Sequence, residues 1–146
     1  MYFLCYNAAM ENLKLKLEEY VNTNLPKGWL PYYIYEIIVD DQVVGKITLR
    51  EGTCEQRYFD GHIGYSIDKN YRGHHYSYYA LNEVIEIAWQ KKFNELIITT
   101  DPSNIASKKN IQRVGKYIET LEIPKSLKKD FSDEEKLKEI YKISRV

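Results

Sequence analysis

The sequence predicts an α/β fold of the α+β type: a mixed, mostly antiparallel sheet with one central parallel βαβ pair and flanking helices. Three observations predict it. Short segments rich in Tyr, Ile and Val, separated by turns, fill much of the first half of the chain. A helical pattern then lies between two short apolar segments at 62–67 and 95–100. The length of 146 residues suits one domain, so we expect a single domain over 1–146.

The first half is expected to hold one helix and three strands. Over residues 8–22, Leu13, Leu17 and Tyr20 share one helical face, which predicts an amphipathic helix. Three segments rich in β-formers follow at 32–39, 43–50 and 57–67. Asp40-Asp41 is a turn between the first two, so the series predicts an antiparallel meander.

The second half is expected to alternate strands and helices. The segment 77–92 carries a helical apolar stripe between the strands 62–67 and 95–100. A strand, helix and strand over this length form a βαβ unit, so these two strands should be parallel with a right-handed crossover. The remaining expected elements are a helix over 103–114, a strand over 116–123, a charged insert over 124–138 and a strand over 139–145.

Helix boundaries in this half are predicted from capping residues. Ser103 is the expected N-cap of the second helix, and Gly115 is its expected stop. Ser132-Asp133-Glu134-Glu135 fits a capping box, which predicts the start of a short helix within the charged insert.

Composition excludes several classes of function. Lys and Arg together number 21, as do Asp and Glu, so no bulk nucleic-acid binding is expected. The two cysteines form no disulfide framework and suit a reducing compartment. No apolar run reaches the roughly 18 residues that span a membrane, and the N-terminus lacks the features of a signal peptide. A cytoplasmic protein with no membrane segment is therefore expected.

The segment Arg72-Gly73-His74-His75-Tyr76-Ser77 is the strongest functional signal. It lies between a strand and a helix, where backbone N–H groups and the helix dipole favour a phosphate. Arg72 adds a bidentate donor, and Gly73 allows close approach of the backbone. The same residues also fit an ordinary strand-to-helix turn. The segment is neither a Walker loop nor a dinucleotide fingerprint, because it lacks their Gly, Lys and Ser/Thr pattern.

The surroundings of this loop resemble the GNAT superfamily of N-acetyltransferases, and most closely a bacterial branch of predicted acetyltransferases. The resemblance is strongest from about residue 43 to residue 115. It lies in Gly61-His62-Ile63-Gly64-Tyr65-Ser66-Ile67, Asn104-Ile105-Ala106-Ser107, Gly28-Trp29-Leu30-Pro31 and Val43-Val44-Gly45-Lys46-Ile47. The family's Arg/Gln-x-x-Gly-x-Gly/Ala loop falls on residues 72–77.

The resemblance implies a strongly bent sheet whose fourth and fifth strands splay apart around acetyl-CoA. Tyr65, Ser66 and Ile67 would pair with the pantetheine arm through backbone groups. Asn104 and Ser107 would lie near the pantetheine and the thioester. The pyrophosphate would be held by the loop residues Arg72, Gly73, His74, His75, Tyr76 and Ser77. Gly64 would mark a bulge in the strand.

The chain departs from the family pattern at three positions. His75 stands where the family usually has Gly, and a positive φ there would strain it. Ser77 stands where the family has Gly or Ala. Ile111 stands where many relatives carry a Tyr that protonates the leaving thiolate, so the general acid is unassigned.

The resemblance implies direct attack of an amine on the thioester, which requires a neutral amine. His62 is the predicted general base, with Asp60 and Glu36 as weaker candidates, although a His on a strand is more often structural. The backbone N–H of Ile67 would meet the oxyanion. Arg50 at a strand end fits either a carboxylate contact or a solvated position.

Two functions are carried forward. The first is an acetyl-CoA-dependent N-acetyltransferase acting on the primary amine of a small molecule or peptide. The second is a CoA-binding sensor or interaction module without turnover. A purely structural domain and a metal site at His62, His74 and His75 are less consistent with the pattern. A homodimer fits the family, and the acceptor is not encoded in any motif.

Overall fold

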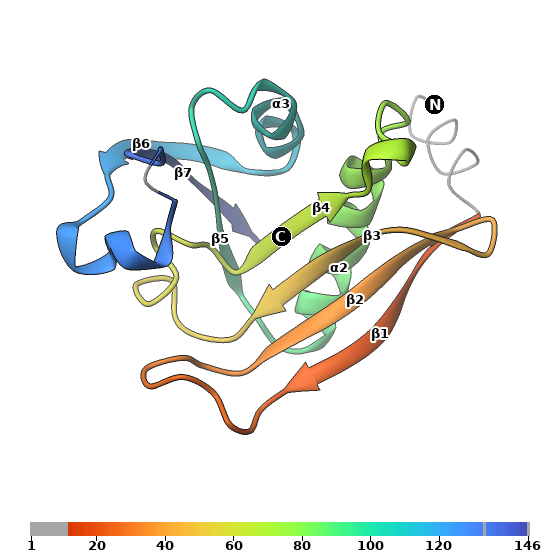
Figure 1. Cartoon of the computed structure of the whole chain (residues 1–146), viewed down its shortest axis with the longest axis horizontal. Coiled ribbons are helices and arrows are strands. Elements are labelled where there is room, and N and C mark those ends of the chain that lie inside the picture. The colour runs from red at the N-terminus through yellow and green to blue at the C-terminus, as the bar shows by residue number, and fades with distance from the viewer. Residues whose placement is uncertain (1–11, 133, 146) are drawn as a thin grey trace. The chain divides into compact units, whose positions relative to one another are not determined.

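The computed structural model describes residues 12–132 and 134–145, which form two compact units (Figure 1). The first unit comprises the described residues up to Glu51 together with Gly64–Lys92. The second comprises Gly52–Ile63 and the described residues from Phe93 onward. Within the described residues, no helix is long and apolar enough to cross a membrane.

The first unit is built on a four-stranded sheet in the order β1-β2-β3-β4. Its strands are β1 (Leu13–Val21), β2 (Tyr32–Val39), β3 (Gln42–Arg50) and β4 (Ile63–Ile67). β1 with β2 and β2 with β3 are antiparallel pairs. The expected turn at Asp40-Asp41 is present, and both residues have positive φ, 50° and 65°. Two such residues form the tight hairpin turn that matches the twist of the strands.

Helix α2 (Tyr76–Gln90) lies along one side of this sheet and contacts β1 and β3 (Figure 1). The predicted apolar stripe is confirmed, because Ala80, Leu81, Val84 and Ala88 are completely buried. Burying a side chain such as Leu81 stabilises the fold by about 1.5–3 kcal/mol. The helix therefore fixes the strand-to-helix loop that precedes it.

The predicted helix over residues 8–22 is wrong: residues 13–21 form strand β1, and residues 8–11 lie outside the described residues. Leu13, Leu15 and Leu17 alternate with lysines, which is the period of a strand. On β2, Tyr35 pairs with Leu17 and Tyr33 pairs with Tyr20. The two partners on β2 are two residues apart, whereas Leu17 and Tyr20 on β1 are three apart, because β1 has a bulge between Leu17 and Glu19. The bulge thus turns a two-residue spacing into three, which imitates the spacing of a helical face.

The second unit holds a three-stranded antiparallel sheet in the order β5-β7-β6. Its strands are β5 (Glu95–Thr100), β6 (Lys116–Glu122) and β7 (Leu137–Ser144). Helix α3 (Ile105–Val114) contacts β5 and β7. These elements were expected from the sequence within a few residues.

Two expectations for this unit need correction. The segment 54–60 forms turns instead of the start of a strand, with Gly61 N–H donating to Arg57 O at 2.8 Å. One half of the predicted capping box forms, since Ser132 N–H donates to Glu135 Oε1 at 3.1 Å, while Glu135 N–H donates to the backbone oxygen of Ser132 at 3.0 Å. The expected helix does not follow it within the described residues, since β7 already starts at Leu137. The helical turn of the charged insert lies before the box instead, as the 3₁₀ helix η2 (Lys125–Asp130).

The fold is α+β with antiparallel sheets, and the expected parallel pairing of β4 with β5 is not among the pairings of the described residues. His62 N–H donates to Ile97 O at 2.7 Å, as a ladder would begin. The N–H of Ile97 then donates to the ring Nδ1 of His62 at 2.9 Å. The ring of His62 thus takes up the N–H of Ile97, which is then not available to a backbone acceptor.

Candidate functional site

The loop that joins β4 to α2 is anchored at the end of the strand. Asp68 N–H donates to Val44 O at 2.8 Å, and the 3₁₀ helix η1 (Lys69–Tyr71) follows. The Nε–H of Arg72 donates to Ile67 O at 2.9 Å, although the side chain is exposed. Since a guanidinium carries five N–H donors, this bond holds Arg72 at the strand end without using its whole donor set.

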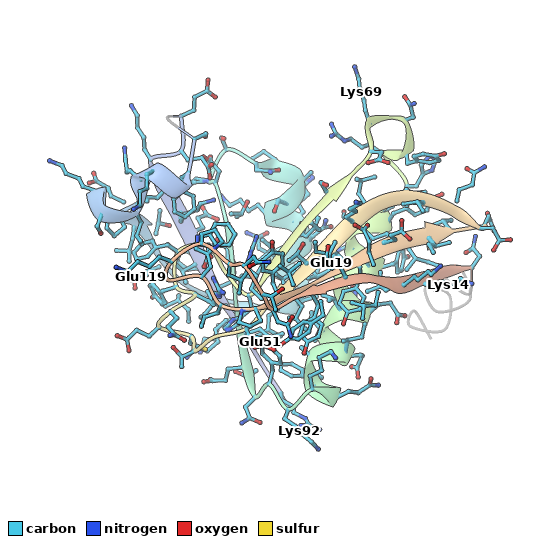
Figure 2. All side chains as sticks on the ribbon, turned by 60° about the horizontal axis from the view of Figure 1, so that its bottom comes forward. Lys14, Glu19, Glu51, Lys69, Lys92 and Glu119 are labelled. Atoms are coloured by element: carbon cyan, nitrogen blue, oxygen red, sulfur yellow. The ribbon has the colours of Figure 1, made fainter. Side chains whose placement is uncertain are left out.

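The second half of the loop forms the start of α2. Gly73 has φ 91°, and a Cβ at this position would meet nothing within 4 Å, so the loop is open here. His75 occupies the N-cap position with φ 62°, in the left-handed region, and its side chain does not cap the helix. The first turn of α2 holds no acidic residue. The positive end of the helix dipole is therefore not offset by a carboxylate in that turn. Lys69 projects from the same loop (Figure 2).

The strand before the loop packs closely on its neighbour. A Cβ on Gly45 of β3 would lie 2.3 Å from Ser66 O, so the two backbones approach more closely than a side chain allows. A Cβ on Gly64 would lie 2.8 Å from an Nη atom of Arg50. The end of the Arg50 side chain therefore lies against the backbone of Gly64.

His62, the predicted general base, is 1% exposed. Its Nδ1 accepts from Ile97 N–H at 2.9 Å, so its Nε2 carries the proton and donates to Gly52 O at 2.8 Å. The ring also lies edge-on to Phe93, with 5.7 Å between centroids. These contacts occupy both ring nitrogens and favour a structural role, and the role of His62 as base stays a prediction.

The other two candidates for the general base, Asp60 and Glu36, have charged neighbours. Asp60 forms an ion pair with Arg57 at 2.9 Å. Glu36 on β2 lies across the strands from Lys16 and Lys46. Ile111, at the position where relatives carry an acid, is completely buried in the core.

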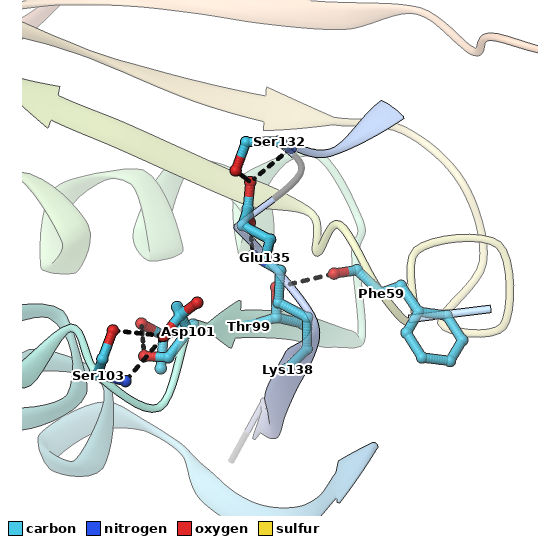
Figure 3. Close-up of polar contacts among 8 residues, drawn as sticks. Phe59, Thr99, Asp101, Ser103, Ser132, Glu135 and Lys138 are labelled. Atoms are coloured by element: carbon cyan, nitrogen blue, oxygen red, sulfur yellow. Dashed lines mark hydrogen bonds and ion pairs between the residues drawn. The ribbon is translucent and has the colours of Figure 1, made fainter. Parts of the chain in front are cut away.

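Asn104 caps α3, because its Oδ1 accepts from Ser107 N–H at 3.2 Å. The predicted cap, Ser103, instead binds Asp101 Oδ1 through its N–H at 2.8 Å and its hydroxyl at 2.6 Å (Figure 3). These hydrogen bonds hold the pKa of Asp101 below its usual range. The Asn-x-x-Ser pattern thus has a structural role in starting the helix, while contact of Asn104 and Ser107 with a cofactor remains a prediction.

One polar cluster in the first unit had no sequence signal. The hydroxyls of Tyr20 and Tyr33 donate to Glu51 Oε2 at 2.9 and 3.3 Å, and their rings stack at 4.3 Å. The ammonium of Lys91 lies 4.2 Å from the Tyr33 ring centroid. The hydrogen bond to Glu51 raises the pKa of Tyr20 to about 12. The bulge in β1 places Tyr20 here, and no sequence pattern predicted that bulge.

In the first unit, the loop between β4 and α2 is suited to bind an anion. This strand–loop–helix arrangement stands in an α+β fold. The model of the acetyltransferase (GNAT) domain family matches residues 7–116. The chain therefore belongs to the GNAT family, the acyl-CoA-dependent N-acetyltransferases. No curated protein matches the chain in sequence.

Several solved structures share this fold. A GNAT family acetyltransferase from Elizabethkingia anophelis with acetyl-CoA bound has a TM-score of 0.68 at 12% identity, over 92% of this chain and 99% of that one. The microcin C7 self-immunity acetyltransferase, in complex with acetyl-CoA and AMP, has a TM-score of 0.62 at 16% identity, over 78% of this chain and 61% of that one.

A third similar structure is an acetyl transferase from Salmonella typhimurium that modifies the N-terminal serine of the ribosomal protein L7/L12. It has a TM-score of 0.62 at 14% identity, over 82% of this chain and 66% of that one. The chain thus spans less than two thirds of the length of the microcin C7 and Salmonella proteins. At these identities the likeness establishes the fold alone.

Proposed function

We propose that the chain is an acetyl-CoA-dependent N-acetyltransferase that acetylates the primary amine of a small molecule or a peptide by direct attack. The observation that carries the proposal is the Arg72–Ser77 loop, which leads from β4 into the N-terminus of α2. Family membership supports it, and so does the acetyl-CoA bound in the Elizabethkingia and microcin C7 structures.

In this proposal the loop binds the pyrophosphate of the cofactor. The helix N-terminus supplies positive potential, and Arg72, already held at Ile67 O, supplies further donors. The left-handed conformation of His75 turns the backbone into the helix. Tyr65, Ser66 and Ile67 are proposed to pair with the pantetheine arm, and Asn104 and Ser107 to lie near the thioester.

The reaction requires one proton to leave the acceptor. The amine nitrogen attacks the thioester carbonyl carbon, the C–N bond forms, and the C–S bond breaks as the CoA thiolate leaves. An alkyl amine with a pKa of about 10.4 costs roughly 4.6 kcal/mol to deprotonate at pH 7. A general base, or a lower acceptor pKa, has to offset that cost.

The test is acetyl-CoA binding followed by turnover. Acetyl-CoA should raise the melting temperature, and an amine panel should release free thiol. Arg72→Ala should weaken acetyl-CoA binding roughly 10-fold or more, because a hydrogen bond to a charged group contributes about 1.5–3 kcal/mol. Lys14→Ala is the matched control, since it removes one exposed positive charge from β1 in the same unit. Equal affinities of the two variants would exclude the phosphate role of Arg72.

The alternative is a CoA-binding module without turnover. Two observations favour it: both ring nitrogens of His62 are hydrogen-bonded, and Ile111 is buried where an acid is usual. A melting shift with acetyl-CoA and no thiol release with any amine would support this alternative. No shift at millimolar acetyl-CoA would exclude both functions.

A further inference from the structure

The second unit contains a pocket of about 470 Å³ beside α3. It is lined by Lys108, Gln112, Gly115, Tyr117, Glu139 and Tyr141. None of these residues was predicted to bind the cofactor. The volume lies within the range of about 300–1,000 Å³ that is usual for small-molecule sites, and the pocket is broadly open to solvent.

The polar side chains of the pocket form one connected network. Lys108 Nζ lies 2.9 Å from Glu139 Oε2, and the hydroxyl of Tyr141 donates to Glu139 Oε1 at 2.9 Å. The Gln112 side chain also hydrogen-bonds the Tyr141 hydroxyl. Glu139 is 7% exposed, and both of its oxygens have partners. A buried carboxylate held in this way fixes the positions of its neighbours.

Tyr117 provides a rigid aromatic surface at the edge of the pocket. The residue is 52% exposed. Its ring packs edge-on against buried Tyr141, with 5.5 Å between centroids, and its hydroxyl lies 2.7 Å from Thr120 Oγ1. An exposed ring that is held by a neighbouring ring and at its hydroxyl offers aromatic surface for stacking with little loss of side-chain entropy.

The charges of the pocket decide against a simple ion as its ligand. The ammonium of Lys108 is offset by Glu139, so an anion gains little from it. The oxygens of Glu139 are occupied, so a cation would have to displace Lys108 or Tyr141. What remains is hydrogen bonding: the ammonium has three donors, one of which serves Glu139, and the Gln112 amide has both donors and acceptors.

We propose that this pocket binds a planar heteroaromatic ring that carries a donor and an acceptor side by side, as a nucleobase does. The ring stacks on Tyr117, and its polar edge meets Lys108 and Gln112. Gly115 brings the end of α3 close to β7, since a Cβ there would lie 3.3 Å from Ile143 and from the carbonyl oxygen of Lys142. The site uses no residue of the Arg72–Ser77 loop and does not depend on acetyl transfer.

The test compares ligands and variants by calorimetric titration of the full chain. Adenosine and nicotinamide should bind, whereas cyclohexanecarboxamide, which has the amide but no planar ring, should not. Tyr117→Leu should weaken adenosine binding about 10-fold, because it removes the aromatic face on which the base stacks. Tyr117→Phe should retain it. Ile118→Ala is the control, because Ile118 is exposed on the same strand and does not line the pocket.

Unchanged adenosine affinity in Tyr117→Leu, with a melting temperature like that of the parent chain, would overturn the proposal. So would saturable binding of cyclohexanecarboxamide equal to that of nicotinamide, or no binding of any ring at millimolar concentration. A further outcome is that adenosine and coenzyme A compete in the parent chain but no longer compete in Arg72→Ala. That result would assign the adenosine ring to the cofactor site and would overturn the proposal as well. Simultaneous binding of adenosine and coenzyme A would support a second site.

Discussion

His75 tests whether the loop stores backbone strain. It has φ 62° at the N-cap of α2, where the family usually has Gly, and its side chain is exposed and makes no capping hydrogen bond. A non-glycine residue in the left-handed region costs about 1–2 kcal/mol. Glycine removes this cost but loses about 0.5–1 kcal/mol through the greater freedom of the unfolded chain. His75→Gly should therefore stabilise the protein by about 0.5–1 kcal/mol, using these two values.

The assay is thermal unfolding of His75→Gly beside His74→Gly. His74 is not among the described residues with positive φ, and its ring stacks on Tyr76 at 5.2 Å between centroids. The His74 variant gains nothing from relief of strain, loses the ring contact and should be destabilised by about 0.5–1 kcal/mol. For a chain of this size, 1 kcal/mol corresponds to about 2–4 °C in melting temperature, so the two neighbours should move in opposite directions.

A lower melting temperature for both variants would refute the reasoning, because it would mean that the left-handed conformation of His75 carries no appreciable cost. Acetyl-CoA binding gives a separate readout. The substitution of His75 by glycine keeps the backbone N–H at this position, so His75→Gly should not weaken binding. Weaker binding by a more stable variant would assign the His75 ring a direct role toward the cofactor.

Two further predictions concern the first unit. Gly45→Ala places a Cβ 2.3 Å from the backbone oxygen of Ser66 and should destabilise the fold by about 3 kcal/mol or more, because the backbone has to shift. Gly73→Ala meets no atom within 4 Å and should cost only about 1–2 kcal/mol for its φ of 91°. A loss in chemical denaturation that is no larger for Gly45→Ala than for Gly73→Ala would contradict this. Tyr20 has its pKa raised from 10.0 to about 12 by the hydrogen bond to Glu51, so its contribution to stability is complete below pH 10 and is lost as pH rises toward 12. Tyr20→Phe should flatten this alkaline decline in unfolding measurements, and an unchanged decline would exclude Tyr20 as its source.

Much of the fold was predictable because local pattern and tertiary packing agree. The apolar stripe of α2 has one helical period, and its buried residues follow that period. The Tyr- and Ile-rich segment β2 and the apolar segment β5 are short runs of β-formers that are at least partly buried over most of their length. β1 was not predictable in the same way, because its bulge between Leu17 and Glu19 produces two competing periods. Only the pairing with β2, a contact between distant parts of the sequence, decides between them.

The candidate site likewise has features that the sequence predicted and features that it did not. The family motif indicated the unusual position of His75, and the structure gives it a left-handed conformation. The motif gave no sign that the ring of His62 would accept from Ile97 N–H. That bond depends on how a strand end meets a neighbouring strand, and residue types alone do not encode it. The βαβ pattern likewise predicted a parallel ladder of β4 with β5 that is not among the pairings of the described residues.

The hydrogen-bonded ring of His62 has a consequence for the choice of acceptor. With Nε2 donating to Gly52 O and Nδ1 accepting from Ile97 N–H, this side chain has no lone pair available for the proton of the amine. Where no other side chain takes the proton in the proposed reaction, it passes to solvent, and the acceptor's own pKa sets the free-energy cost. At pH 7 that cost is about 4.6 kcal/mol for a lysine-type amine with a pKa of about 10.4, but only about 1 kcal/mol for an α-amine with a pKa of about 7.7–8.0. The CoA thiol that leaves has a pKa of about 8.5, so it departs as a thiolate with less need of a general acid than the amine has of a base.

Thiol release should therefore be faster at neutral pH with a peptide that has a free N-terminus than with the same peptide N-acetylated and carrying one lysine. Raising the pH from about 8 to about 9 should increase the lysine rate nearly 10-fold but the α-amine rate by less than about 2-fold, since at least about half of the α-amine is already neutral at about pH 8. His62→Gln keeps an N–H donor and an acceptor in the buried site and should preserve both pH profiles. A lysine rate that is independent of pH over this range in the parent chain, and becomes pH-dependent in His62→Gln, would restore His62 as the base and overturn the structural role inferred from its two hydrogen bonds.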